Sequence, residues 1–155
     1  MRRKDREIAD KKEISEIIQR AQVCHVAMSD NDVPYIVAMN FGFDEERSLL
    51  YFHSATSGKK LDILARNNLI CFQFDIDHQL IGGDTACDWG MSFRSVVGMG
   101  RVSIVTTRQE KIEALNLIMN HYSGKKDYDY PEDQLAITNI IRVEITELTG
   151  KKKGY

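Results

Sequence analysis

The stretch "LYFHSATSGKKLDILARN", Leu50 to Asn67, changes its pattern twice. An apolar run reaches a histidine, small hydroxyl residues and one glycine follow, and two lysines then open a segment with helical spacing. The apolar run predicts a strand and the final segment predicts a helix. The chain therefore mixes strands and helices, and the loop between these two carries the polar groups that could bind a ligand.

Strand-like runs dominate the rest of the chain. Besides "LLYFHS" they are "VCHVAM" from Val23, "YIVAMNFGF" from Tyr35, "LICFQFD" from Leu69, "FRSVVGMGRVSIV" from Phe93 and "IIRVEITEL" from Ile140. Turn residues in "SDNDVP" and "DEERS" separate the early runs at the spacing of a meander. Gly98 and Gly100 would allow a bend or bulge in the longest run, as a small barrel needs at a corner.

Two further segments have helical spacing. "ADKKEISEIIQRA" forms an apolar face over Ile14–Ile18, with Asp10 as the candidate N-cap, and "TTRQEKIEALNLIMNHY" pairs Thr107 with Glu110 at the spacing of a capping box. The strands outnumber the helices, and most are joined without a crossover helix. We therefore expect a mainly β (α+β) fold, an antiparallel barrel of five or six strands with peripheral helices, as one domain over residues 1–155.

Composition excludes several classes of protein. The chain has 155 residues and a formal net charge of −2, which argues against a protein that covers nucleic acid or an anionic membrane. No run approaches the ~18 apolar residues of a membrane span, and the charged start does not resemble a signal peptide. Three cysteines fit a reducing compartment, so we expect a cytoplasmic protein. The basic ends, "MRRKDR" and "GKKKGY", predict solvated tails, with a weak anion-binding or interface role as the alternative.

Residues 76–92, "IDHQLIGGDTACDWGMS", show no period and contain three glycines. This pattern predicts a long irregular segment that carries a function or lies against a partner. It also gathers His78, Asp84, Cys87 and Asp88, but none of them has the C-x₂-C or H-x₃-H spacing of structural zinc sites, so no metal is expected. The other cysteines, Cys24 and Cys71, lie in strand-like runs and are expected to be small core residues.

The loop that begins at His53 does not match the common nucleotide-binding motifs. A P-loop would need a glycine five positions before Gly58, where His53 stands, and a hydroxyl residue in the place of Lys60. "GMGRVS" lacks the third glycine of a dinucleotide fingerprint. The loop does combine hydroxyl donors, a glycine, two lysines and a helix start whose free N–H groups suit an anion. The residues alone leave two interpretations, a phosphate site and a plain surface loop.

Four segments in order, "VPYIVAMNFGFD", "LLYFHSATSGKKLDIL", "NNLICFQFD" and "RSVVGMGRV", resemble the flavin-binding split-barrel family related to pyridoxamine 5′-phosphate oxidase. The likeness is greatest to its small bacterial branch with the nitroimidazole-resistance proteins, and it runs from about Ile14 to Gly150. It implies an antiparallel six-stranded split β-barrel with peripheral helices. It also implies FMN as cofactor and a homodimer with FMN at the interface, each site built from both chains.

The same resemblance assigns cofactor-binding residues. The strand matching "VAMN" runs along the flavin ring, the loop after His53 binds ribityl and phosphate groups, and "RSV" reaches the flavin from the other side. Lys59 matches the family's phosphate lysine. The implied set is Val37, Ala38, Met39, Asn40, His53, Ser54, Ser57, Lys59, Lys60, Arg94, Ser95 and Val96.

Departures from the family narrow the expected activity. The chain lacks the C-terminal arginine–histidine element that helps the oxidase proper hold pyridoxal phosphate, so oxidation of vitamin B6 is not expected. Gly58 stands where the oxidase has the arginine of an Arg-Lys pair, so Lys60 can supply the second positive charge. His53 is the candidate catalytic residue; the alternative is that it only hydrogen-bonds the FMN phosphate or a carbonyl. Trp89 and Phe93 are candidates for a substrate lid or for core or dimer packing.

Three hypotheses follow for the function. The first is an FMN-dependent oxidoreductase that reduces a small nitro- or quinone-type molecule. The second is a flavin- or haem-binding carrier or sensor on the same barrel, without turnover. The third is a barrel that has lost its ligand and acts through protein contacts.

Overall fold

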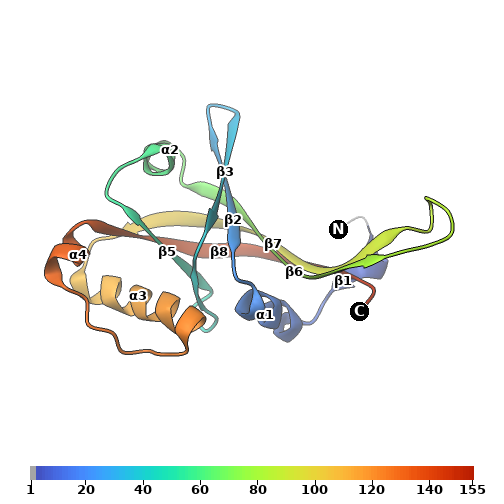
Figure 1. The fold of residues 1–155 in the computed structure, drawn as a ribbon. Coiled ribbons are helices and arrows are strands. Elements are labelled where there is room, and N and C mark those ends of the chain that lie inside the picture. The colour runs from blue at the N-terminus through green and yellow to red at the C-terminus, as the bar shows by residue number, and fades with distance from the viewer. Residues whose placement is uncertain (1–2) are drawn as a thin grey trace.

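The structure is a computed structural model that describes residues 3–155, and it forms one antiparallel sheet with helices around it (Figure 1). In chain order the elements are η1 (Lys4–Arg6), β1 (Glu7–Ile8), α1 (Lys11–Arg20), β2 (Cys24–Asp30), β3 (Val33–Met39), β4 (Gly42–Asp44), β5 (Leu49–Ala55), α2 (Lys59–Arg66), β6 (Leu69–Ile81), β7 (Gly90–Val105), α3 (Arg108–Ser123), α4 (Glu132–Ala136) and β8 (Thr138–Lys153). The strand order is β3-β2-β6-β7-β8-β5-β4, with β1 paired to β8. The expected mainly β fold with peripheral helices is confirmed, and over the described residues the sheet stays open between β3 and β4.

The sheet has eight strands because two short ones join the six that the sequence predicts. One is β1, which pairs with the end of β8. The other is β4, which arises because the predicted run "YIVAMNFGF" leaves the sheet at Asn40 and Phe41. The Phe41 side chain is fully buried there. A side chain at Gly42 would lie 2.8 Å from the backbone nitrogen of Ile118, so glycine lets α3 pack directly on β4.

The helix starts follow the predicted caps. The Asp10 carboxylate accepts a hydrogen bond of 2.9 Å from the backbone N–H of Lys12 at the start of α1. The Thr107 hydroxyl accepts one of 3.4 Å from the N–H of Glu110 at the start of α3. Both side chains satisfy amides that have no partner inside the helix, so both N-caps are confirmed. The capping box at α3 is only half formed, because the Glu110 carboxylate accepts a hydrogen bond of 3.0 Å from Arg142.

The core lies inside the curved sheet. Its largest fully buried side chains include Phe41, Phe52, Phe72 and Phe74, and the rings of Phe41 and Phe74 lie 4.8 Å apart. α1 and α2 pack their apolar residues into this cluster, while α3 covers a second, smaller one on β5 and β8. The same strand alternation that fills the core turns every second side chain away from it.

The opposite side of β3, β2, β6 and β7 carries side chains that are exposed or half-buried, and we call it the outer face. Its residues are Ile36, Ala38, His25, Ala27, Cys71, Gln73, Asp75, Ser95, Val97 and Met99. One cross-strand row joins Ile36, Ala27, Cys71 and Met99. Cys71 was expected in the core, but the register turns it outward. The outer face is therefore an apolar surface with polar groups at one end.

The prediction of an irregular segment over residues 76–92 is wrong for most of its length. β6 continues to Ile81 and β7 begins at Gly90, with Leu80 paired to Met91, so only residues 82–89 are irregular. We call the hairpin from Gln79 to Ser92 the arm, and it projects from one end of the sheet (Figure 1). Its strands lack the usual alternation because almost none of its side chains is buried, so no core selects apolar residues at every second position.

A bulge between Ile76 and Gln79 starts the arm, and ion pairs hold it. Asp77 adopts a left-handed φ of 58° there. Its two carboxylate oxygens accept hydrogen bonds of 2.6 Å from Arg20 of α1 and Arg94 of β7. The bulge is thereby tied to α1 and to the neighbouring strand.

The C-terminal residues complete this anchor. The Tyr155 hydroxyl donates a hydrogen bond of 2.6 Å to the carbonyl of Asp77, and its ring lies 3.9 Å from the Arg94 guanidinium. Lys152 donates to both carboxylate oxygens of Glu13 at 2.8 and 2.9 Å. The prediction that "GKKKGY" is a solvated tail is therefore wrong, since β8 runs through Lys153. Of the other basic end, Met1 and Arg2 lie outside the described residues.

The predicted bend of the longest strand is confirmed. β7 shifts its register against β8 between Met99 and Gly100. A side chain at Gly98 would lie 2.3 Å from the Phe72 ring, and one at Gly100 would lie 2.4 Å from Val143. Glycine is needed at both positions because the neighbouring strands and core side chains leave no room for a Cβ.

The ion pairs at the bulge predict a pH-dependent stability. Asp77→Asn should lower the free energy of unfolding by about 1 kcal/mol at neutral pH, a modest effect because the group is partly exposed. Hydrogen bonds from Arg20 and then Arg94 lower the pKa of Asp77. The stabilisation is thus fully present above the pKa of the unfolded carboxyl, about 3.9, and is lost as the pH falls through the lower folded value. Denaturant unfolding of both proteins at about pH 7 and about pH 3 should show the difference shrinking in acid; an equal difference at both would contradict the ion-pair account.

Candidate functional site

The predicted binding residues form two groups in the structure. We call Val37–Asn40 with His53–Lys60 the loop group, and Arg94–Val96 the strand group. His53 lies opposite Ile140 on β8, whereas Arg94 lies opposite Lys152 on the same strand. Twelve residues of extended strand separate these positions, or about 40 Å at ~3.3 Å per residue. A single chain therefore keeps His53 far from Arg94, whereas Ala38 lies only three strands away from Val97, across His25 and Gln73.

The start of α2 is open, unlike the starts of α1 and α3. Gly58 is its N-cap, and no side chain caps it. The Gly58 carbonyl accepts hydrogen bonds from the N–H groups of Leu61 and Asp62 at 2.9 and 3.1 Å. Within the described residues, the N–H groups of Lys59 and Lys60 have no recorded hydrogen bond. Two backbone donors and the positive end of the helix dipole thus face outward beside two ammonium groups, which suits a phosphate.

Gly58 fits this role by its conformation. Its φ of 137° is one that L side chains rarely adopt, and a Cβ built there would meet nothing within 4 Å. Glycine is therefore required here because of its backbone conformation, and not because a side chain would clash with a neighbour. The space above the loop is open enough for a ligand to approach the backbone closely.

The two lysines connect α2 to β3 and to the core. The Lys59 ammonium lies 4.7 Å from the centre of the Tyr35 ring, a cation–π contact with a residue of β3. Lys60 lines a narrow internal gap together with Met39 and Phe52. The structure thus brings the end of β3, the end of β5 and the start of α2 together, as one contiguous part of the predicted site.

The end of β5 presents its side chains unevenly. His53 is exposed and, within the described residues, makes no recorded hydrogen bond or ion pair. Ser54 is buried, and its hydroxyl donates to the carbonyl of Ala55 at 2.9 Å. Ser57 is exposed beside the start of α2. His53 and Ser57 are available to a ligand, whereas Ser54 is already engaged.

β3 is an edge strand, which agrees with its predicted backbone contacts. It pairs with β2 on one side and ends the strand order on the other. Val37 and Met39 face inward, whereas Ala38 and Asn40 are exposed. A planar ligand could therefore contact this strand through its free edge or through the exposed residues Ala38 and Asn40.

The strand group is less available than the sequence suggests. The Val96 side chain is fully buried in the core, so it cannot touch a ligand on the outer face. Arg94 is occupied by Asp77 and, at 3.7 Å, by Glu13. Ser95 alone faces outward, and its hydroxyl lies 3.5 Å from the carbonyl of Lys151. Of this group only Ser95 presents a side chain to the outer face.

Sequence reasoning missed a polar cluster on the outer face. Asp75 lies 3.7 Å from Nδ1 of His25 and 3.0 Å from Nε2 of His78. Across the ladders, His25 is paired with Ala38 and Asp75 with Ser95. The cluster thus lies between the two predicted groups. Local spacing could show only the Asp75–His78 part of it, because His25 comes from β2 and the other two residues come from β6.

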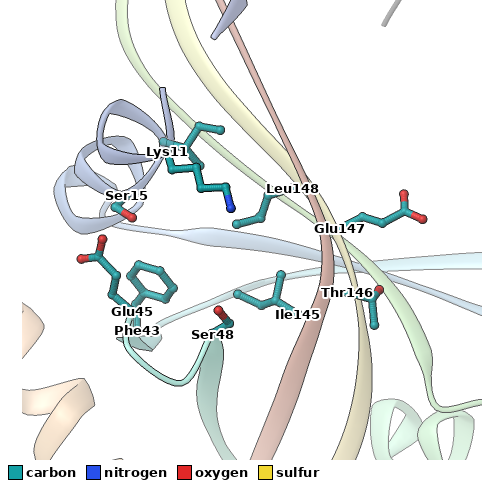
Figure 2. Close-up of a pocket in the computed structure, with 10 residues that line it drawn as sticks. Lys11, Ser15, Phe43, Glu45, Ser48, Ile145, Thr146, Glu147 and Leu148 are labelled. Carbon is teal, nitrogen blue, oxygen red and sulfur yellow. The ribbon is translucent and has the colours of Figure 1, made fainter. Parts of the chain in front are cut away.

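Two clefts of the structure lie away from the predicted binding residues. One of 370 Å³ opens between α1, the β4–β5 turn and β8, with Phe43, Ile145 and Leu148 among its apolar residues and Lys11 and Glu45 at its rim (Figure 2). Another, of 490 Å³, lies beside α2 and includes Thr56 of the loop group. None of the twelve predicted binding residues lines either cleft, but Asn40 lines a third, of 460 Å³, together with Gln22 and His121.

Among residues 3–155, no three histidine, cysteine, aspartate or glutamate side chains lie close enough together to hold a metal ion. Over the same residues, no helix is long and apolar enough to cross a membrane.

The comparisons with known proteins agree on the fold. The model of the pyridoxamine 5′-phosphate oxidase family matches residues 10–152. A candidate 5-nitroimidazole antibiotic resistance protein from Bacteroides thetaiotaomicron VPI-5482 is 34% identical, with a TM-score of 0.84 over 94% of this chain and 86% of that one. No curated protein matches this chain at a significant level.

More distant structures share the architecture. The flavocytochrome Anf3 from Azotobacter vinelandii has a TM-score of 0.85 at 19% identity, over 100% of this chain and 72% of that one. An FAD-binding protein from Mesorhizobium loti has a TM-score of 0.70 at 19% identity, over 96% of this chain and 98% of that one. The family match over most of the chain and the 34% identical relative confirm the resemblance read from the sequence: the chain belongs to the pyridoxamine 5′-phosphate oxidase family.

Proposed function

We propose that this protein binds FMN and reduces a small nitro- or quinone-type molecule, as a cytoplasmic homodimer. The observation that carries the proposal is the open start of α2, where two free backbone N–H groups and two lysines surround a glycine. Three free cysteines, one of them exposed, suit the reducing conditions of the cytoplasm.

The phosphate of FMN matches the loop group in charge and in hydrogen bonding. A dianion needs several donors and positive charge, and Lys59, Lys60 and the amides of α2 supply both. Each charge-assisted hydrogen bond contributes about 1.5–3 kcal/mol, so three or four would hold a phosphate firmly. Neither lysine has a recorded carboxylate partner within the described residues, so no internal salt bridge must be broken first.

The chain's own residues would bind and orient the cofactor. Bound flavin supplies the group that accepts and delivers electrons or hydride. The free edge of β3 offers N–H and C=O groups for the ring edge, and His53 offers an exposed imidazole that can hydrogen-bond a ligand or donate a proton to a substrate. Since no other residue of the loop group is a natural acid or base near neutral pH, His53 stays our candidate catalytic residue.

The relatives support the choice of cofactor and acceptor. One protein of this fold is described as a flavocytochrome, one as FAD-binding, and the 34% identical relative as a candidate 5-nitroimidazole resistance protein. These descriptions concern those proteins. They make flavins the cofactors to test first and nitroaromatic compounds the acceptors to test first.

A homodimer would explain the divided site. The start of α2 and Ser95 lie far apart in one chain, and the outer face exposes Ile36 and Val97 with 64% and 39% of their areas free. An exposed apolar surface of this kind often marks an interface. In a two-fold dimer formed through the outer face, with the axis running across the strands, each end of one copy meets the opposite end of its partner. Two complete sites would result.

The first prediction concerns cofactor retention. Lys59→Glu should weaken FMN binding at least tenfold, because it replaces one favourable charge with a repulsive one beside the phosphate. Lys126→Glu, in an exposed loop with no recorded side-chain contact, makes the same charge change and is the matched control. The affinity of each purified protein for FMN and for FAD is measured by titration, followed by flavin fluorescence. Equal losses in both variants would remove the loop as the phosphate site, and tighter binding of FAD would correct the cofactor.

Turnover is tested on the FMN-loaded protein. A nicotinamide donor should bleach the visible flavin absorption, and a nitroaromatic or quinone should restore it under anaerobic conditions. His53→Gln should slow the second step and leave FMN affinity unchanged if the imidazole acts as an acid. A stable yellow protein that no acceptor reoxidises would favour the carrier or sensor hypothesis, and preferential uptake of haem would point to His53 as a candidate axial ligand.

Oligomeric state is tested on the outer face. Val97→Lys places a charge at the centre of this face and should convert a dimer to a monomer at micromolar concentration. Ile137→Lys is the control, since Ile137 is 59% exposed at the far end of the sheet beside α4. Sedimentation equilibrium gives the masses. A wild-type protein with the mass of one chain would contradict the homodimer.

A further inference from the structure

The arm has one apolar face that nothing in its own chain covers. Leu80 and Met91 are cross-strand partners, and the Trp89 ring lies over Gly82, where an added Cβ would be 3.7 Å from it. The exposed fractions of Leu80, Trp89 and Met91 are 62%, 54% and 42%. An isolated two-stranded hairpin is only marginally stable in water, so a partner surface is expected to cover it.

This apolar face continues the outer face. On β7, Met91, Phe93, Ser95, Val97 and Met99 are alternate residues of one strand, so all of them point to the same side. The β6 bulge leaves β7 regular through this region. Whatever covers the outer face therefore lies next to the arm as well.

Hydrogen bonds at its base and at its tip fix the direction of the arm. Its base is tied through Asp77 to α1 and β7, and Tyr155 closes over this anchor. At its tip the Asp88 carboxylate accepts hydrogen bonds from the N–H and the hydroxyl of Thr85 at 3.0 and 2.7 Å. The hairpin points away from α2, α3 and α4, which lie at the other end of the ribbon (Figure 1). It cannot reach the loop group of its own chain.

Charge indicates where the tip would lie on a second copy. Residues 79–93 carry two carboxylates, Asp84 and Asp88, and no lysine or arginine. The start of α2 carries Lys59 and Lys60, without a recorded carboxylate partner in the described residues. Opposite charges at the two ends favour an arrangement in which one copy's tip meets the other copy's α2 end. The acidic tip argues against an anionic membrane as the occupant.

We propose that the arm of each copy lies over the loop group of its partner and brings Trp89 against the ligand bound there. This inference rests on the proposed function, because it assigns the missing wall of the same site. The two-fold axis that places Ser95 of one copy near the loop group of the other also places the first copy's arm at that end. Trp89 then covers the ligand and restricts the acceptors that can enter, and both chains contribute to each site.

Disulfide trapping tests the position of the arm. Cys87 lies exposed at the tip. Thr56→Cys adds a thiol within the loop group, and Cys71→Ser removes the half-buried thiol of the outer face. Cys24 is buried, and burial raises the pKa of its thiol, so it does not interfere. Mild oxidation with diamide should give covalent dimers. Lys126→Cys is the matched control with an exposed thiol elsewhere, and it should give none.

Fluorescence supplies a second readout, because Trp89 is the only tryptophan of the chain. Its emission should be blue-shifted in the flavin-free dimer relative to the Val97→Lys monomer, and added FMN should quench most of it. A dimer that gives no trapped product, or traps Lys126→Cys equally well, would overturn the inference, and so would a wild-type monomer.

The outcomes separate this inference from the proposed function. Trapping and a blue shift without any flavin binding would support the arm and refute the FMN site. Tight FMN binding with unchanged Trp89 emission and no trapping would support the FMN site and refute the arm.

Discussion

The ladder that joins β6, β7 and β8 is the constraint on which the rest of the structure depends. Its hydrogen bonds fix which side chains face the core, because a slip by one residue would exchange the two faces of a strand. Val96 is buried in the core and Ser95 faces outward, half-buried, for this reason alone. The same ladder holds the two ends of the molecule far apart. A ligand the size of a flavin therefore cannot reach both the start of α2 and Arg94 of the same chain.

The sequence predicted most of the fold, because many of its signals are local. Asp10 and Thr107 cap their helices as their spacing indicates, and Gly98 and Gly100 mark the bend of the longest strand. The predictions failed where strands run beyond the core. Nothing buries one side of residues 76–81 or of Lys151–Lys153, so their composition resembles that of loops, and only pairing with neighbouring strands orders them.

The candidate site was predictable in part for a related reason. Gly58, Lys59 and Lys60 are consecutive, so their chemistry could be read directly from the sequence, whereas FMN itself entered only through the family resemblance. Arg94 pairs with Asp77 at the β6 bulge and with Glu13 of α1, and Glu13 lies 81 residues before Arg94 in the chain. The cluster of His25, Asp75 and His78 also depends on pairing between distant strands. Only a three-dimensional structure could reveal these contacts.

The contacts between the beginning and the end of the chain have a consequence for biosynthesis. β1 pairs only with β8, and the contact of Lys152 with Glu13 spans 139 residues. His121 and Tyr122 hold the carbonyls of Ala21 and Gln22 across 100 residues. Such non-local contacts slow folding, and here the early segments meet their partners only after nearly the whole chain has been made. On the ribosome, the apolar side of α1 must wait for β6 and β7, and β1 must wait for β8, so we expect nascent chains to need protection from aggregation until synthesis ends.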